Sequence, residues 1–293
     1  MPAFYFDVDW NTHNANFNTN YAQGLRPTAI AMREAQGVAL YSAAWLPNDG
    51  RYWETWSGVD YQGLLQWIAK WQAQGYEMKV LTSTESLFSA VMEKTNVGTV
   101  FVSDLADGPS TTPGTLAYQL NAYQKKGSNY VPRAIAIYGS AGAARRYAVV
   151  FEPCQENWSY RFWDTDIQAT QARRAFFDDL MYRPTLLGYS PEGTLFSVYR
   201  DDSIGPNNWA CSNGQSGAEV TATYNTLAGR GLWALSLSAS PGGTFASVFV
   251  TTETPCPREL RVVGSDVANL SSTFDPIIIG LMQSSQWPNV GQL

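Results

Sequence analysis

The sequence predicts an α+β fold of six helix-plus-β-hairpin repeats, closed into a propeller-like ring. Three observations predict this fold. A hairpin pattern recurs five times, with successive copies 50 to 54 residues apart. Segments of helical period separate the copies, and the two ends of the chain resemble the two halves of one more hairpin. The 293 residues are 45% hydrophobic and 15% charged, which favours one large folded domain over residues 1–293.

The five hairpin segments share two alternating apolar and polar runs, each pair separated by turn residues such as SPEG at 190–193. The second run of each segment places an aromatic residue before small or β-branched residues. A chance match would not keep one period over four intervals. The segments are residues 24–47, 75–94, 129–153, 181–202 and 231–252.

The segments between the hairpins place their apolar residues on one helical face. They predict helices at 64–71, 116–123, 172–180 and 220–227, and a weaker, Asn-rich helix at 11–22. A last helix is expected after Asp275 and Pro276, which form a good N-cap and first-turn pair.

The ends of the chain predict how the ring closes. Residues 286–293 match the first strand of the fourth hairpin and then stop, whereas residues 3–10 match its second strand. We therefore expect residues 3–9 to complete a sixth hairpin, which removes exposed strand edges. The expected units are 10–49, 53–102, 112–153, 158–202, 209–252, and 262–293 completed by 3–9.

A short motif opens two of the hairpins, GLRP at 24–27 and YRP at 182–184. Together with the Gly-containing turn and the aromatic second strand, it resembles the bacterial tandem repeat family, which also forms the N-terminal region of fungal polyglycine hydrolases. The resemblance covers nearly the whole chain, although Glu77-Met78 and Trp233-Ala234 replace Arg-Pro in two units.

In polyglycine hydrolases the repeats precede a β-lactamase-like domain with a Ser-x-x-Lys nucleophile. No lysine of this sequence has a serine three positions before it. The resemblance therefore implies the non-catalytic part of such a protein, which recognises a protein substrate.

Candidate catalytic groups are few. The single histidine, His13, lies in the weakest predicted helix with no nucleophile nearby, so we expect a surface residue. Paired carboxylates are compatible with a glycosidase, but several precede predicted helices, where acidic residues act as caps. With one His and three Cys, neither a metal site nor a cofactor is expected. The pairs are Asp7 with Asp9, Asp104 with Asp107, Asp164 with Asp166, Asp178 with Asp179, and Asp201 with Asp202.

Tryptophans are the predicted ligand-binding residues. Trp56, Trp158 and Trp209 recur at multiples of the repeat, in the loop expected between the second strand and the helix. Trp10 lies in the comparable loop of the first unit, and Trp53 and Trp163 lie close to these positions. An indole can stack on a sugar ring or a peptide. The alternative is that each one fills the gap between the hairpin and the helix of its own unit.

The charge pattern limits the partners. The net charge is −6 and the Lys and Arg residues are scattered, so nucleic acid and anionic membranes are not expected. No apolar run is long enough for membrane insertion. The sequence predicts a lectin-like, non-catalytic protein that binds neutral glycans through the aromatic loops. A protein-binding substrate-recognition module related to serine hydrolases and an uncharacterised hydrolase are the alternatives.

Sequons at Asn157 and Asn269 favour an extracellular location, whereas the first ten residues lack a signal-peptide pattern and leave the cytoplasm as the alternative. Cys154 and Cys256 occupy equivalent repeat positions two units apart, too far for a bridge. Any disulfide is therefore expected to involve Cys211. The sequence does not indicate an oligomeric state.

Overall fold

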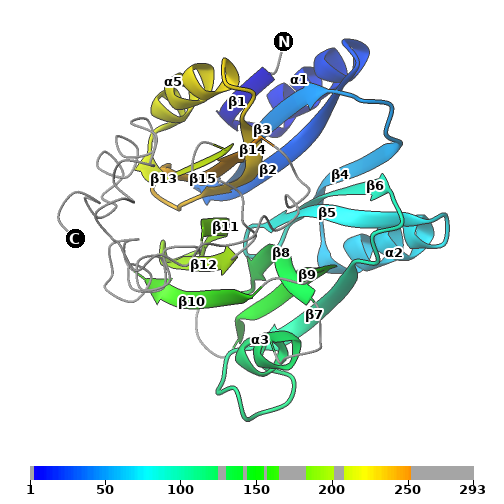
Figure 1. Ribbon diagram of the computed structural model, residues 1–293, viewed down its shortest axis with the longest axis vertical. Helices are drawn as coiled ribbons and strands as arrows, with labels where there is room; N and C mark the ends of the chain where they lie inside the picture. Colours follow the sequence, from blue (N-terminus) through cyan, green and yellow to red (C-terminus); the bar gives the residue numbers. More distant parts are fainter. Residues whose placement is uncertain are drawn as a thin grey trace, which may run out of the picture.

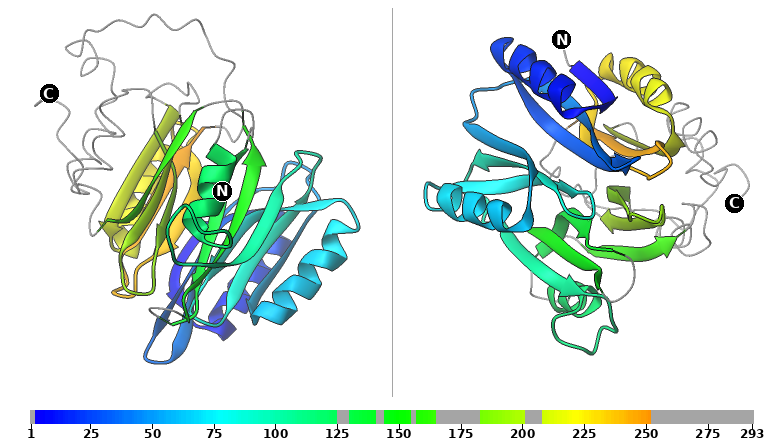
Figure 2. Two further views of the ribbon diagram at one scale, coloured as in Figure 1. Left: turned by 90° about the horizontal axis from the view of Figure 1, so that it is seen from below. Right: turned by 180° about the vertical axis from the view of Figure 1, so that it is seen from behind.

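The computed structural model describes residues 3–124, 130–140, 144–154, 157–164, 183–200 and 208–251. These residues form five three-stranded antiparallel sheets with helices on their flanks. The sheets lie around a common centre, as both the front view and the two turned views show (Figure 1, Figure 2). The fold is thus repetitive, as the sequence period predicted.

The first repeat shows the plan of all five. It consists of β1 (Ala3–Val8), α1 (Trp10–Ala22), β2 (Leu25–Ala35) and β3 (Val38–Pro47). The sheet order is β1-β3-β2, so the hairpin β2–β3 carries β1 on the free side of β3. We call β1 and its equivalents the outer strands, and β2 and its equivalents the inner strands.

The other repeats follow the same order along the chain. All five predicted hairpins, and the helices predicted at 11–22, 64–71, 116–123 and 220–227, are confirmed. The helices predicted at 172–180 and after Asp275 lie outside the described residues. The elements are β4 (Trp53–Val59), α2 (Tyr61–Gln72), β5 (Tyr76–Ser83) and β6 (Phe88–Lys94); β7 (Val100–Ala106), α3 (Leu116–Gln124), β8 (Tyr130–Tyr138) and β9 (Arg146–Pro153); β10 (Trp158–Asp164), β11 (Arg183–Tyr189) and β12 (Leu195–Arg200); and β13 (Trp209–Gln215), α5 (Gly217–Ala228), β14 (Trp233–Ala239) and β15 (Phe245–Val250).

The outer strands correct two expectations. The segments before the helices were expected to be loops, and residues 3–9 were expected to complete a sixth hairpin. Instead, β1 belongs to the first sheet, where Ala3 pairs with Trp45 and Tyr5 with Ala43. The alternating pattern of residues 3–10 is shared by strands in general and does not specify a partner. Residues 252–293 lie outside the described part, and the six-unit ring is not confirmed.

Each outer strand ends in a bulge that directs the chain into its helix. The pairing register of all five outer strands shifts near their ends. Four of the bulges contain a residue of positive φ, between 51° and 71°, namely Asp7, Gly58, Asp104 and Gly214. An N-cap side chain then begins the helix at Asp9, Asp60 and Ser216. Bulges of this kind bend a strand away from its sheet, which explains the abrupt change from strand to helix.

The Arg-Pro motif also lies at a bulge. In every inner strand the register shifts by one residue at the same place, for example between Pro27 and Ala29 and between Pro184 and Leu186. Proline donates no backbone hydrogen bond and is tolerated in strands at bulges and edges. The motif therefore marks the first third of the inner strand.

Neighbouring repeats pack against one another in cyclic order. The inner strands contact each other in the order β2, β5, β8, β11, β14, and β14 in turn contacts β2. Helix α5 of the fifth repeat packs on β1 of the first, where the rings of Phe4 and Tyr224 lie 4.2 Å apart. The first and fifth repeats are therefore neighbours. Among the described residues, no helix is long and apolar enough to span a membrane.

Candidate functional site

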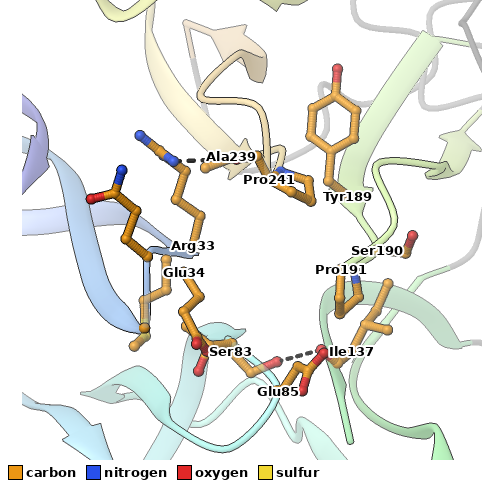
Figure 3. Close-up of a pocket in the computed structure, with 14 residues that line it drawn as sticks. Arg33, Glu34, Ser83, Glu85, Ile137, Tyr189, Ser190, Pro191, Ala239 and Pro241 are labelled. Carbon is orange, nitrogen blue, oxygen red and sulfur yellow. Dashed lines mark hydrogen bonds between the residues drawn. The ribbon is translucent and has the colours of Figure 1, made fainter. Parts of the chain in front are cut away.

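A cavity of about 280 Å³ lies where the inner strands converge, at the end of the molecule that carries the hairpin turns (Figure 3). All five repeats contribute to it. Its floor is formed by the residues that occupy the same paired position, close to the turn, in each inner strand. These residues are Met32, Ser83, Ile137, Tyr189 and Ala239.

The cavity narrows toward the middle of the molecule. A second cavity of about 40 Å³ is lined by aliphatic residues placed two positions earlier in the inner strands. Its lining also includes Lys79, Thr82 and Arg133, so the narrow cavity has a mixed polar and apolar lining. The aliphatic residues are Ile30, Leu81, Ile135, Leu187 and Leu237.

Hydrogen bonds between repeats hold the cavity floor in place. The hydroxyl of Ser83 donates to the carbonyl oxygen of Ile137 at 2.9 Å, which joins the second and third repeats. The backbone N–H of Tyr189 donates to the hydroxyl of Ser238 at 2.8 Å, which joins the fourth and fifth. Burial raises the pKa of the Tyr189 hydroxyl, so this group remains neutral at physiological pH.

Arg33 is the basic residue on the cavity wall, and its charge is already paired. Its guanidinium makes two hydrogen bonds of 2.8 Å to the carboxylate of Asp7. A third, of 3.2 Å, reaches the carbonyl oxygen of Pro241 in the fifth repeat. The hydrogen bonds to Asp7 raise the pKa of Arg33. Arg33 thus connects β1, β2 and the last hairpin turn.

Two carboxylates on the cavity rim are not paired in this way. Glu34 and Glu85 are exposed and lie on the same side of the cavity, beside Ser83 (Figure 3). Within the part of the chain that the structure describes, neither side chain forms an ion pair. The Glu85 backbone is fixed, because its carbonyl oxygen accepts a 2.7 Å hydrogen bond from Gly139. The rim therefore carries uncompensated negative charge.

The predicted ligand-binding tryptophans differ in exposure. Trp10 and Trp56 are 46% and 42% exposed, whereas Trp158 and Trp209 are 6% and 4% exposed and belong to the core. Trp158 and Trp209 are the first residues of β10 and β13, and their side chains pack in the hydrophobic core. Trp53 is half-buried against Tyr21 at 5.7 Å. Trp163 lies in β10, but its side chain is outside the described part.

The prediction that His13 lies on the surface is wrong. Only 3% of His13 is exposed, and its ring stacks on Tyr41 with the centroids 4.5 Å apart. The hydroxyl of Tyr5 lies 2.9 Å from Nδ1. Burial lowers the pKa of His13 to about 4, so the ring is neutral near pH 7 and enclosed. The sequence of α1 is too polar throughout to show which face is buried.

The described carboxylates of the predicted pairs have structural partners. Asp9 caps α1 by accepting a 2.8 Å hydrogen bond from the N–H of Thr12, as expected for an acidic residue before a helix. Asp104 lies 3.3 Å from Arg146, and Asp107 accepts a hydrogen bond from the hydroxyl of Tyr147. The remaining side chains lie outside the described part: Asp164, Asp166, Asp178, Asp179, Asp201 and Asp202.

Two of the three cysteines are described. Cys154 and Cys211 are both buried, and burial raises the pKa of the Cys211 thiol. Cys256 lies outside the described residues, so the expectation about the disulfide stays a prediction.

Sequence reasoning missed the central cavity. Its lining residues are of ordinary types, and about one repeat length separates each from the next. The available signal was their common position before the hairpin turn, which becomes informative only when the inner strands are known to converge.

The comparison with known families agrees with the repeat architecture. The family model of the polyglycine hydrolase-like structural repeat matches three segments, residues 2–48, 50–95 and 206–252. These segments correspond to the first, second and fifth repeats of the structure, each with its outer strand included. The three matches show polyglycine hydrolase-like structural repeats within the chain, as in a tandem-repeat domain of that type.

Proposed function

We propose that this chain is a non-catalytic recognition domain that binds an extended segment of a protein ligand in the central cavity. The observation that carries the proposal is that all five repeats contribute to one cavity, whose lining combines apolar side chains such as Met32 and Ile137 with polar ones. Its volume of about 280 Å³ suits one or two side chains. The ligand would therefore insert one or two side chains of the segment into the cavity.

The lining favours a polypeptide over a simple sugar. Met32, Ile137 and Pro191 present aliphatic surface, and none of the six candidate tryptophans lines the cavity. Sugars are commonly bound on flat aromatic rings, and Tyr189 is the single aromatic residue among the described residues that line this cavity. The relation to the polyglycine hydrolase-like repeat also supports a protein ligand, because such hydrolases act on peptide chains.

The non-catalytic part of the proposal is supported by the state of the candidate catalytic groups. His13 is enclosed and neutral, so it cannot take a proton from a substrate in solution. Asp7 is engaged by Arg33, and Asp9 is engaged by the first turn of α1.

The experiment is selection of a displayed random peptide library on the full chain, followed by affinity measurements with the selected peptides. Pro241 is exposed on the rim, so Pro241→Trp should obstruct the mouth without altering the core. We expect this variant to bind the selected peptides on the order of tenfold more weakly, about 1.4 kcal/mol.

The control variant is Val97→Trp, which adds the same indole at an exposed position of the second repeat that does not line the cavity. It should bind like the wild type. Equal binding by Pro241→Trp, with an unchanged melting temperature, would contradict the proposed site.

A second candidate, the neutral glycan predicted from the sequence, rests on the two exposed tryptophans. Trp10 lies over the bulge of β4, 3.4 Å from the place that a Cβ on Gly58 would occupy. Trp56 is part of the same strand. Two exposed indoles beside one bulge offer a small platform for a sugar chain.

The test for the glycan is a glycan array probed with wild type and with the double variant Trp10→Ala, Trp56→Ala. Signals that disappear in the double variant support the platform. Signals that persist in it, or an array with no signal, speak against it.

A further inference from the structure

We propose that the ligand segment in the central cavity carries a positive charge beside an aliphatic side chain. The charge would be a lysine or arginine side chain or a free amino terminus. This inference rests on the proposed function and adds the chemistry of the ligand to it.

The aliphatic part follows from the depth profile of the cavity. Met32, Ile137 and Ala239 contribute apolar side chains to the floor. The narrow cavity adds further aliphatic side chains, together with those of Lys79 and Arg133. A nonpolar group placed there leaves water without leaving a polar group of the ligand unsatisfied, which favours Leu, Ile, Val or Met.

The positive charge follows from the balance of charges on the lining. The described residues of the lining include one basic and two acidic side chains: Arg33, Glu34 and Glu85. Arg33 is offset by Asp7 through two hydrogen bonds of 2.8 Å, so it contributes little net charge to the cavity. Glu34 and Glu85 have no such partner among the described residues. The rim of the wide cavity is therefore negatively charged, whereas two basic side chains line the narrow cavity.

The two glutamates lie on the same side of the cavity (Figure 3). Glu34 comes from the end of β2 and Glu85 from the turn after β5, and both are beside Ser83 on one side of the cavity (Figure 3). A cation on the rim and an aliphatic group on the floor are thus compatible with one extended segment. The net charge of −6 would also speed the approach of a basic ligand.

The test uses synthetic copies of the library-selected peptides, each made with a free and with an acetylated amino terminus. We expect the selected sequences to be rich in Lys, Arg or a required free amino terminus next to an aliphatic residue. The double variant Glu34→Gln, Glu85→Gln should bind them on the order of tenfold more weakly, since charge-assisted hydrogen bonds are lost. Added sodium chloride should weaken binding to the wild type more than to the variant.

The control is Glu54→Gln, which removes a carboxylate of the second repeat that does not line the cavity and should leave the affinity unchanged. Neutral or acidic peptides that bind the double variant normally but fail with Pro241→Trp would overturn this inference and keep the proposed function. If all the selected peptides bind Pro241→Trp as tightly as they bind the wild type, both this inference and the proposed function are contradicted.

Discussion

The single histidine of the chain lies in an aromatic enclosure of the first repeat. The ring of His13 stacks on Tyr41 and contacts Trp10, and Tyr5 lies at its Nδ1 atom. Burial disfavours the charged imidazolium and holds the pKa of His13 at about 4, below its usual value of 6.5. Protonation of this side chain therefore opposes folding.

The stability of the protein should consequently decrease as the pH falls from 6.5 toward 4. In that window the unfolded chain binds a proton on His13 and the folded chain does not. Between pH 7 and pH 5 we expect a loss of about 2 kcal/mol in the free energy of unfolding. Chemical denaturation at both pH values measures it.

The matched control for this pH effect is His13→Gln, which keeps a polar partner for Tyr5 but does not titrate. Its free energy of unfolding should change by clearly less between the same two pH values. An identical pH dependence of wild type and variant would show that His13 is not held neutral.

A buried ion pair joins the first repeat to the second. Arg26 of the GLRP motif lies 2.9 Å from Glu93 at the end of β6, and the two residues are 4% and 2% exposed. Arg51 binds the other carboxylate oxygen of Glu93 at 3.1 Å. The third and fourth repeats have a related contact, because Arg200 lies 2.6 Å from Glu152. Arg26 of the motif and Arg200 at the end of β12 thus each connect two neighbouring repeats.

Glu93→Gln should be strongly destabilising, because it removes the buried carboxylate charge that lies 2.9 Å from the buried guanidinium of Arg26. We expect a loss of about 3 kcal/mol, measured by urea denaturation. Asp49→Asn changes a half-exposed carboxylate that contacts the same two arginines, so it should cost less than about 1 kcal/mol. Similar costs for both variants would argue against a buried inter-repeat pair.

At the scale of the elements, the bulge at the end of each outer strand sets the path into the helix. In β4 this bulge contains Gly58, with φ of 71°. A Cβ placed there would lie 2.8 Å from the hydroxyl of Tyr41 in the first repeat. The glycine therefore provides both the left-handed conformation and a close approach between repeats.

Gly58→Ala should destabilise the protein by about 2 kcal/mol, since it combines backbone strain with a steric clash. Gly214→Ala is the comparison, because Gly214 has φ of 69° at the equivalent bulge but a Cβ added to it would meet no atom within 4 Å. Its cost should be about 1 kcal/mol, from conformation alone. Thermal unfolding of both variants compares them, and equal melting temperatures would contradict the close packing on Tyr41.

The elements also show what the sequence could predict. Hairpins were predictable because two alternating runs with a turn, such as 181–202, determine their own pairing. The outer strands were not predictable in this way. The partner strands of β4 and β13 begin 29 and 30 residues after β4 and β13 end, and a helix lies between. Such pairing is non-local. In addition, an aromatic-rich run such as Trp53–Val59 is compatible with an exposed loop as well as with a strand.

At the scale of the whole molecule, the period identified the repeats but not the order in which they meet. Nothing in a 50-residue period specifies that the fifth repeat contacts the first. The contact depends on the aromatic residues Phe4, Phe6, Tyr224 and Phe245, whose rings meet between β1, α5 and β15. The candidate cavity could not be predicted for the same reason, since it exists only when all the inner strands converge.

The most direct test of this arrangement is a double-mutant cycle between the first and fifth repeats. The rings of Phe4 and Tyr224 lie 4.2 Å apart, although the residues are far separated in sequence. We expect Phe4→Leu and Tyr224→Leu to show a coupling energy of about 1 kcal/mol in the free energy of unfolding. Phe4→Leu combined with Tyr123→Leu of α3 should be additive. A coupling indistinguishable from zero for Phe4 and Tyr224 would contradict the contact between the end repeats and, with it, the central cavity.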